Sequence, residues 1–176
     1  ELTAGHPILE PLGETMLRAR DVLRREIAVQ HRQLLAIART DHVCRHLMTV
    51  PGVGALTALT FKTGVDDPTR FTSSKRLGAH FGLTPRKYQS GTVDVSGRIT
   101  KAGDAMVRSA LYEAAHSMLT RVKTFSSLKR WAMAVAKRRG LGRATVALAR
   151  KLAIVLHRLW IDGTDFRFGK QEASTA

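Results

Sequence analysis

Cysteine and long apolar runs are what this sequence has least of. Cys44 is the single cysteine among 176 residues, which excludes an intramolecular disulfide and fits a reducing cytoplasm. No apolar run approaches the roughly 18 residues that a membrane-spanning helix needs, so we expect no membrane span. The chain also lacks an initiating Met and a signal-peptide pattern, and we expect Glu1 to begin the C-terminal portion of a longer protein.

Acidic side chains are scarce as well, and the scarcity is local. The chain has 29 Lys and Arg against 14 Asp and Glu, and residues 62–151 alone hold 19 basic and 5 acidic side chains, a net charge of +14. Such a like-charge cluster destabilises a compact domain unless a polyanion neutralises it, so nucleic acid is the expected partner. An anionic membrane is the weaker alternative, because the cations do not form one amphipathic stripe.

A broken apolar seam runs through the first 48 residues. Apolar side chains recur every three or four positions from Leu12 to Met48, and polar residues such as Glu26 and Gln30 interrupt them. The pattern predicts a long coiled-coil-like helix after a loose lead-in, so we treat residues 1–48 as one segment. Burial against the chain's own core explains the seam; dimerisation, or docking to the part of the protein that precedes Glu1, explains it equally.

A Pro-Gly turn separates that helix from the next one. In the run Val50-Pro-Gly-Val-Gly54, Pro51 and Gly52 stop the first helix and Gly54 allows a tight turn. The pattern predicts a helix-hairpin-helix motif, whose amides and second helix N-terminus face a phosphate, so Gly52 and Gly54 are predicted nucleic-acid contacts. A structural turn between two antiparallel helices is the alternative.

The rest of the chain is predicted to be mainly α-helical. A short helix ends near Phe81, and apolar faces at helical spacing predict further helices over 101–121, 126–139 and 143–160. We expect these helices to form a domain over residues 49–168, followed by a tail at 169–176. The fold class is therefore mainly α.

The middle of the chain, residues 81–104, has neither helical periodicity nor a hydrophobic run. Proline and glycine punctuate it, so we expect a functional loop, either irregular or with a short β-hairpin around 88–99. Ser90 and Ser96 each precede a glycine there, and from the residues alone Ser90 is a turn serine. The cations of this loop and its flanking helices complete the predicted nucleic-acid-binding set: Lys75, Arg76, Arg86, Lys87, Arg98, Lys101 and Arg108.

No group of side chains has convincing metal-ligand spacing. His42 and His46 share a helix face, but Cys44 points away from it, so we expect a packed or solvated pair. Asp66 and Asp67 precede a proline, which is typical of a turn. We therefore predict no metal site in this chain.

Five motifs in order resemble a known family. They are Val50-Pro-Gly-Val-Gly54, Asp67-Pro-Thr-Arg-Phe71, Leu83-Thr-Pro-Arg86, Tyr88-Gln-Ser-Gly91 and Gly97-Arg-Ile-Thr-Lys-Ala-Gly103. Residues 42–168 resemble the C-terminal transposase domain of the DEDD-type insertion-sequence transposases, serine recombinases of which some use a bridge RNA to choose DNA. Many relatives have Ser-Ser-Gly-Gly followed by basic residues, whereas this chain has Gln89-Ser90-Gly91-Thr92-Val93-Asp94, so their phosphate contacts do not transfer.

The resemblance implies a division of labour between two domains. An N-terminal RuvC-like domain carries four acids that hold Mg2+, and the C-terminal domain supplies a serine nucleophile, which falls on Ser90 here. It further implies DNA as partner, a bridge RNA in some members, a homo-oligomer, and action at the nucleoid. Since this chain has no RuvC-like domain, we expect it to be inactive alone. The alternative function is a non-catalytic helix-hairpin-helix module that binds nucleic acid.

Overall fold

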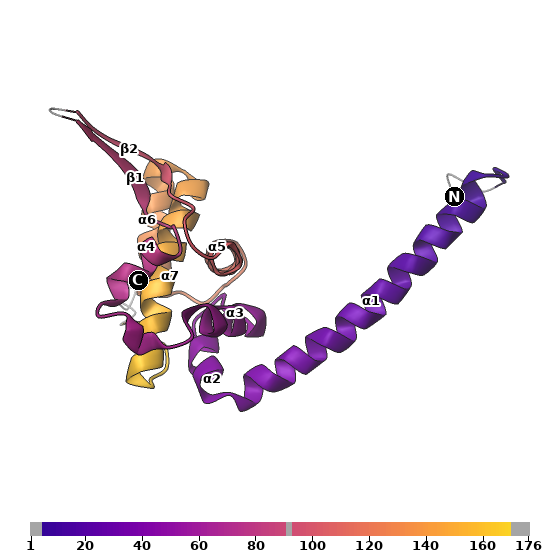
Figure 1. Ribbon diagram of the computed structural model, residues 1–176, viewed down its shortest axis with the longest axis horizontal. Coiled ribbons are helices and arrows are strands. Elements are labelled where there is room, and N and C mark those ends of the chain that lie inside the picture. Colours follow the sequence, from indigo (N-terminus) through magenta and orange to yellow (C-terminus); the bar gives the residue numbers. More distant parts are fainter. Residues whose placement is uncertain (1–4, 91–92, 170–176) are drawn as a thin grey trace, which may run out of the picture. The chain divides into compact units, whose positions relative to one another are not determined.

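The computed structural model describes the backbone of residues 5–90 and 93–169, and the side chains of these residues except 87–96. The fold is mainly helical, as predicted, with one small antiparallel sheet among the described residues (Figure 1). The chain divides into two compact units, residues 1–37 and 38–176, and each is described by itself. Within the described residues, no helix combines the length and apolar character needed to cross a membrane.

Helix α1, Leu9–Thr40, is the long helix that the apolar seam predicts. Most of its large apolar side chains are exposed, for example Leu12 at 55% and Leu23 at 62%, and only Ala38 is buried. The prediction of one continuous helix to Met48 was wrong. Asp41 has extended backbone angles and its carboxylate accepts a hydrogen bond of 2.9 Å from the amide of Cys44, so a new helix, α2, begins at His42.

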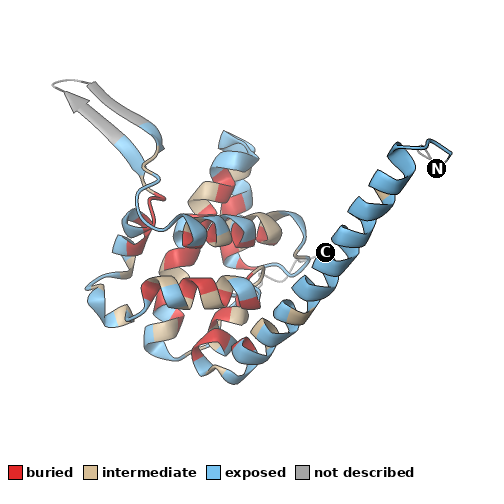
Figure 2. Ribbon diagram, turned by 45° about the vertical axis from the view of Figure 1, so that its right-hand side comes forward, coloured by how far each residue is buried: buried red, intermediate tan, exposed pale blue. Residues whose placement is uncertain are grey.

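The second unit packs around helix α7, Leu141–Asp162. One face of α7 is buried along its whole length, against α5 (Ala105–Thr120) and α6 (Ser127–Arg139) in particular (Figure 2). Helix α2, His42–Met48, and α3, Ala55–Val65, pack on each other, and α3 also packs on α5. Asp104 and Ser126 cap α5 and α6 as their sequence positions predict.

The segment before the hairpin is less regular than the single short helix that we predicted. It consists of two 3-10 turns, η1 at Pro68–Arg70 and η2 at Ser74–Arg76, followed by the four-residue helix α4, Leu77–His80. Asp67 caps η1 by accepting a hydrogen bond of 2.8 Å from the amide of Thr69. All three pieces contact α7. Contacts with α7 therefore replace the hydrogen bonds of a continuous helix.

Strands β1, Pro85–Ser90, and β2, Val93–Ile99, form an antiparallel hairpin. Pro85 pairs with Ile99 and Ser90 pairs with Val93, with a shift of register between Pro85 and Lys87. The hairpin confirms the expected strand pair and begins at Pro85, ahead of the predicted start at 88. Of the predicted tail, residues 170–176 lie outside the described residues.

Candidate nucleic-acid interface

Two glycines hold the ends of the hairpin together. Gly82 and Gly103 have φ angles of +65° and +74°, which residues other than glycine rarely adopt. A Cβ on Gly103 would lie 1.9 Å from the carbonyl oxygen of His80, and one on Gly82 would lie 2.3 Å from that of Ala102. The two chain segments are thus in backbone contact. We call residues 81–86 and 98–103, where the strands leave the helical unit, the hairpin base.

Arg108 joins both sides of the hairpin base. Arg108 lies near the start of α5. Its Nη1 donates to the carbonyl oxygen of Phe81 at 3.2 Å and to that of Ala102 at 3.1 Å. The half-buried guanidinium therefore links the two chain segments of the hairpin base, a structural role that its positive charge does not predict. Its predicted contact with nucleic acid stays a prediction, and only the nitrogens that face away from the two carbonyls are candidates for it.

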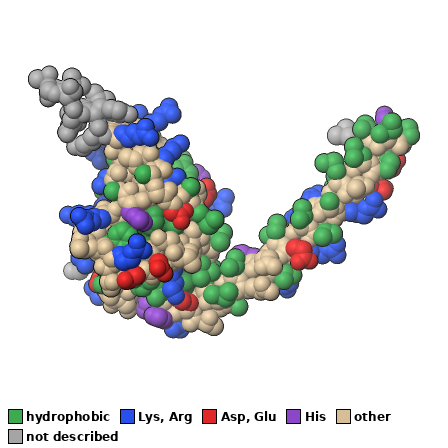
Figure 3. Space-filling view, in the orientation of Figure 1, with side chains coloured by type: hydrophobic (Ala, Val, Ile, Leu, Met, Phe, Trp, Pro, Cys, Tyr) green, Lys and Arg blue, Asp and Glu red, His purple; other side chains and the backbone are tan. Residues whose placement is uncertain are grey.

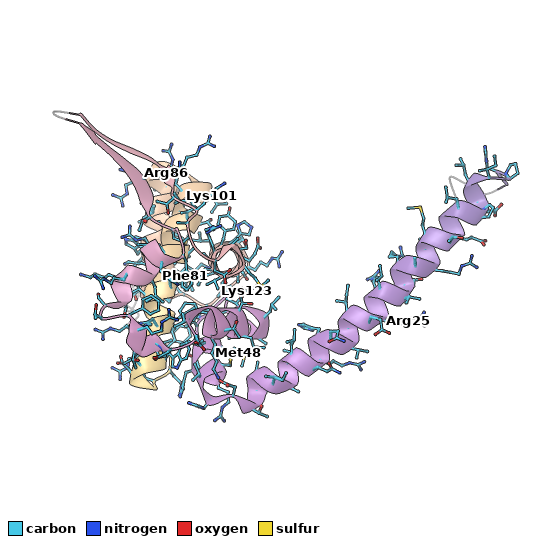
Figure 4. The ribbon with its side chains drawn as sticks, in the orientation of Figure 1. Arg25, Met48, Phe81, Arg86, Lys101 and Lys123 are labelled. Carbon is cyan, nitrogen blue, oxygen red and sulfur yellow. The ribbon has the colours of Figure 1, made fainter. Side chains whose placement is uncertain are left out.

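The remaining cations of the hairpin base are exposed. Figure 4 shows Arg86 and Lys101 where the strands leave the unit, above the buried Phe81. Arg86 donates from Nη2 to the carbonyl oxygen of Thr100 at 3.3 Å, and Arg98 lies next to the end of β2. Among the described side chains, none of these three cations has an ion-pair partner. They are free to meet the phosphates of a polyanion.

Ser90 lies at the other end of the strands from these cations. It is the last residue of β1, and its side chain, like those of Lys87 and Ser96, falls outside the described side chains. Four residues of extended strand separate it from Arg86, which corresponds to about 13 Å between their Cα atoms. The backbone therefore does not gather Arg86, Arg98 and Lys101 around Ser90, although all four belong to one predicted site.

The two glycines of the predicted helix-hairpin-helix differ in their surroundings. Gly52 has φ +86°, and a Cβ there would lie 2.6 Å from the carbonyl oxygen of Ala114 on α5. Gly54 is exposed, caps α3 without a side-chain bond, and has open space around it. Close packing on α5 explains Gly52, whereas the contact of Gly54 with nucleic acid stays a prediction that its exposure allows.

Lys75 and Arg76 are both exposed on η2. A buried histidine holds this turn: Nδ1 of His157 lies 2.8 Å from Oγ of Ser74, and its Nε2 lies 2.9 Å from the carbonyl oxygen of Pro68. Because a carbonyl only accepts, Nε2 carries the proton and Nδ1 accepts from the serine hydroxyl. The half-buried Ser74 thus anchors the turn that carries the two cations.

Asp41 and Cys44 have strongly shifted pKa values, and both shifts come from structural contacts of the core. Burial alone would raise the pKa of Asp41, but the ion pair with Lys62 and the amide of Cys44 lower that pKa to about 2. Burial, with the nearby charge of Asp41, raises the pKa of the Cys44 thiol to about 11, so it is an inert core residue. In the described part of the chain, no three His, Cys, Asp or Glu side chains are grouped as a metal site.

Comparison with known proteins assigns the chain to a family. The sequence model described as "Transposase IS116/IS110/IS902 family" matches residues 44–131, half of the chain. The chain is 36% identical to the transposase for insertion sequence element IS1111A of Coxiella burnetii, over 85% of this chain and 42% of that protein. It is 32% identical to the putative transposase y4pF/y4sB of Sinorhizobium fredii, over 100% of this chain and 47% of that protein.

A third relative extends the range of named activities. A pilin gene-inverting protein of Moraxella bovis is 34% identical over 41% of this chain and 23% of its own length. The chain spans less than half the length of all three relatives. The matched residues 44–131 include the hairpin, its base and both serines. By this match the chain belongs to the IS116/IS110/IS902 transposase family.

Proposed function

We propose that this chain is the DNA-binding, serine-bearing part of a transposase, in which Ser90 attacks a DNA phosphodiester. The observation that carries the proposal is the family match over residues 44–131, which contain a hairpin with a rigid, cationic base and a serine at the end of its first strand. The relatives are more than twice as long as the part that this chain matches, which leaves room for the N-terminal domain that the resemblance implies.

The proposed step conserves the energy of the broken bond. Oγ of Ser90 attacks phosphorus, the bond from phosphorus to one deoxyribose oxygen breaks, and that oxygen takes a proton while the serine proton goes to a base. A serine hydroxyl is a weak nucleophile at neutral pH, so the step needs a base and cations around the phosphate. The serine–phosphate ester can then be attacked by a second DNA hydroxyl, which rejoins the strand and frees the serine.

The groups that activate the serine lie outside the described residues of this chain. With about 13 Å of strand between Arg86 and Ser90, the base cations serve DNA placement better than charge neutralisation at the serine. The resemblance places Mg2+ on four acids of an N-terminal domain, and the described residues offer no set of ligands that fits an ion. We further propose, from the resemblance, that the chain is inactive alone and that it acts on DNA with a bridge RNA as a guide, as some members of the family do. The exposed apolar seam of α1 supports action as a homo-oligomer.

The second candidate function is a non-catalytic helix-hairpin-helix module. The exposed Gly54 at the start of α3 favours it, because the first amides of that helix have no side-chain cap. The packing of Gly52 against α5 weighs against it, since that part of the turn faces the core. In this alternative, Ser90 is only a strand residue and no covalent adduct forms.

The experiment compares Ser90→Ala with Ser96→Ala in the full-length transposase with Mg2+ and radiolabelled DNA. Ser90→Ala is expected to abolish strand exchange and the covalent protein–DNA adduct while DNA binding stays nearly unchanged, since only a hydroxyl is lost. Ser96→Ala, also before a glycine, is the matched control and should retain both. A Ser90→Ala enzyme that recombines DNA at the normal rate would exclude Ser90 as the nucleophile.

A further inference from the structure

The longest acid-free stretch of the sequence lies outside the residues predicted to bind nucleic acid. Residues 114–161 contain 11 Lys and Arg and no Asp or Glu. This stretch covers the C-terminal part of α5, all of α6 and α7 as far as Ile161. Figure 3 shows Lys and Arg side chains gathered at the end of the second unit from which the hairpin leaves. Helix stability alone does not require such a composition.

Helix α7 presents its cations on one exposed face. Arg143 and Arg150 are seven residues apart, as are Lys151 and Arg158, and residues seven apart share a face of a helix. All four side chains are exposed, whereas the opposite face is buried in the core of the unit. We call these four side chains the α7 ridge. From Arg143 to Arg158 it is about 22 Å long.

A second group of cations adjoins one end of the ridge. Lys137, Arg138 and Arg139 are exposed in the last turn of α6, and the single residue Gly140 connects them to α7. Gly140 has φ +82°, its amide donates to the carbonyl oxygen of Ala136, and its own carbonyl accepts from Ala144. This turn is thus tightly fixed, and it keeps three cations beside Arg143.

Among the described residues, the cations of the α7 ridge and of the last turn of α6 have no counter-charge. None of these seven side chains has a carboxylate within ion-pair distance in that part of the chain. Arg143 also lies in the first turn of α7, where the helix dipole disfavours a positive charge and no acid compensates. Nζ of Lys151 lies over the ring of Trp131, 4.0 Å from its centre. This cation–π contact holds the ammonium group in place without neutralising its charge.

The α7 ridge also reaches the predicted interface. Arg150 lies against Gly78 of α4, where a Cβ would be 2.8 Å from its Cγ, and the carbonyl oxygen of Gly78 accepts from the amide of Leu83 at the hairpin base. The turn η2, with Lys75 and Arg76, contacts α7 as well. A linear polyanion that follows the ridge therefore passes beside cations of the predicted set.

We propose that the α7 ridge and the adjoining cations of α6 form a second nucleic-acid-binding surface, which holds the phosphate backbone of a duplex. A duplex carries one phosphate per about 1.7 Å of its axis when both strands are counted, so a span of about 22 Å holds roughly a dozen phosphates, of which those on the near side are within reach of the ridge. Between Arg143 and Arg158, α7 exposes no large apolar side chain, and the exposed Leu141 and Ile161 lie beyond the two ends of the ridge. A membrane-surface helix needs an apolar face along its length. This inference rests on the proposed function, since it assumes that the chain binds nucleic acid.

The test measures binding of the 176-residue chain to DNA and RNA duplexes of about 30 base pairs between roughly 50 and 200 mM salt. The ridge variant changes Arg143 and Arg158 of the α7 ridge and the adjoining Arg139 of α6 to Gln. A matched control changes the exposed Arg24, Arg32 and Arg45 to Gln, which removes the same charge elsewhere. A third variant changes Arg86, Arg98 and Lys101 to Gln and tests the hairpin base.

The ridge variant is expected to lower the slope of log affinity against log salt by about 2.7, or about 0.9 for each lost phosphate contact on DNA, and the control should not change it. The duplex that shows the loss identifies the ligand as DNA or RNA. Equal slopes for the ridge and control variants would overturn the second surface, while a loss in the hairpin-base variant would still support the proposed function. A wild-type chain that binds neither duplex would overturn both, and binding only to phosphatidylserine vesicles would assign the ridge to a membrane.

Discussion

Ser74 and His157 are 83 residues apart in the sequence, yet Oγ of one lies 2.8 Å from Nδ1 of the other. The imidazole is fully buried and uses its second nitrogen on the carbonyl oxygen of Pro68. One side chain of α7 thus fixes both 3-10 turns of the segment that precedes the hairpin. The position of Lys75 and Arg76 depends on this contact.

Ser74→Ala should lower the free energy of unfolding by about 1–3 kcal/mol, because Nδ1 of the buried imidazole loses its hydrogen-bond partner. Urea unfolding followed by circular dichroism measures the change. Ser109→Ala, on the exposed face of α5, is the control and should change stability by less than about 0.5 kcal/mol. Equal effects of the two substitutions would show that the Ser74–His157 bond does not stabilise the fold.

Gly103→Ala should destabilise the protein far more than Gly163→Ala. Both glycines have positive φ, so both variants carry the strain of a side chain there, about 1–2 kcal/mol. Only Gly103 adds an overlap, since its Cβ would lie 1.9 Å from a carbonyl oxygen, whereas Gly163 has open space around it. Thermal unfolding compares them, and similar losses would mean that the hairpin base is not in backbone contact.

Acid should weaken the second unit through Asp41. The pKa of this carboxyl is about 2 in the fold against 3.8 ordinarily, so its contribution is complete above pH 3.8 and is lost as the pH falls towards 2. This difference between the two pKa values corresponds to roughly 2 kcal/mol of the free energy of unfolding. Urea titrations between these pH values should show the decline in the wild type and a flatter profile in Asp41→Asn. Parallel profiles would remove the role of the Asp41–Lys62 pair.

The apolar seam of α1 should mediate assembly. Leu23 is 62% exposed and Leu34 is half-buried, so changing both to Ser removes apolar surface that a partner helix would cover. Sedimentation should then show a smaller assembly, with the unit after Pro51 still folded. The control changes the neighbouring exposed residues Arg24 and Gln33 to Ser. A monomer in every variant would leave the seam with a purely local role.

The sequence predicts the helices of the second unit well because each has local signals. Asp104 and Ser126 are caps that act within three residues, and the apolar faces of α5 and α7 follow the helical period. The break at Asp41 was missed because the residue that pairs with its carboxylate, Lys62, lies 21 positions away. The irregular segment before the hairpin was missed for the same reason, since His157 fixes it from the distant α7.

The candidate site was less predictable than the fold. Positive charge predicts Arg108 to be a phosphate ligand, whereas its contacts with the carbonyl oxygens of Phe81 and Ala102 depend on tertiary structure and are not visible in the sequence. Arg86 and Ser90 are only four positions apart in the sequence, but the extended strand between them puts their Cα atoms about 13 Å apart. The sequence does contain one sign of the α7 ridge, because residues 114–161 include no Asp or Glu. The structure was needed to show that its four cations share one exposed helix face.

The hairpin makes the position of Ser90 a matter of strand length. With the base fixed at Gly82 and Gly103, each residue added to a strand moves the serine outwards by about 3.3 Å. Because side chains alternate between the two faces of a strand, a pair of residues added to β1 and to β2 preserves the orientation of the serine, and a single residue reverses it. If Ser90 acts on DNA as proposed, lengthening both strands in steps of two residues would change how far the hydroxyl reaches. The helical unit that holds the hairpin would not have to change.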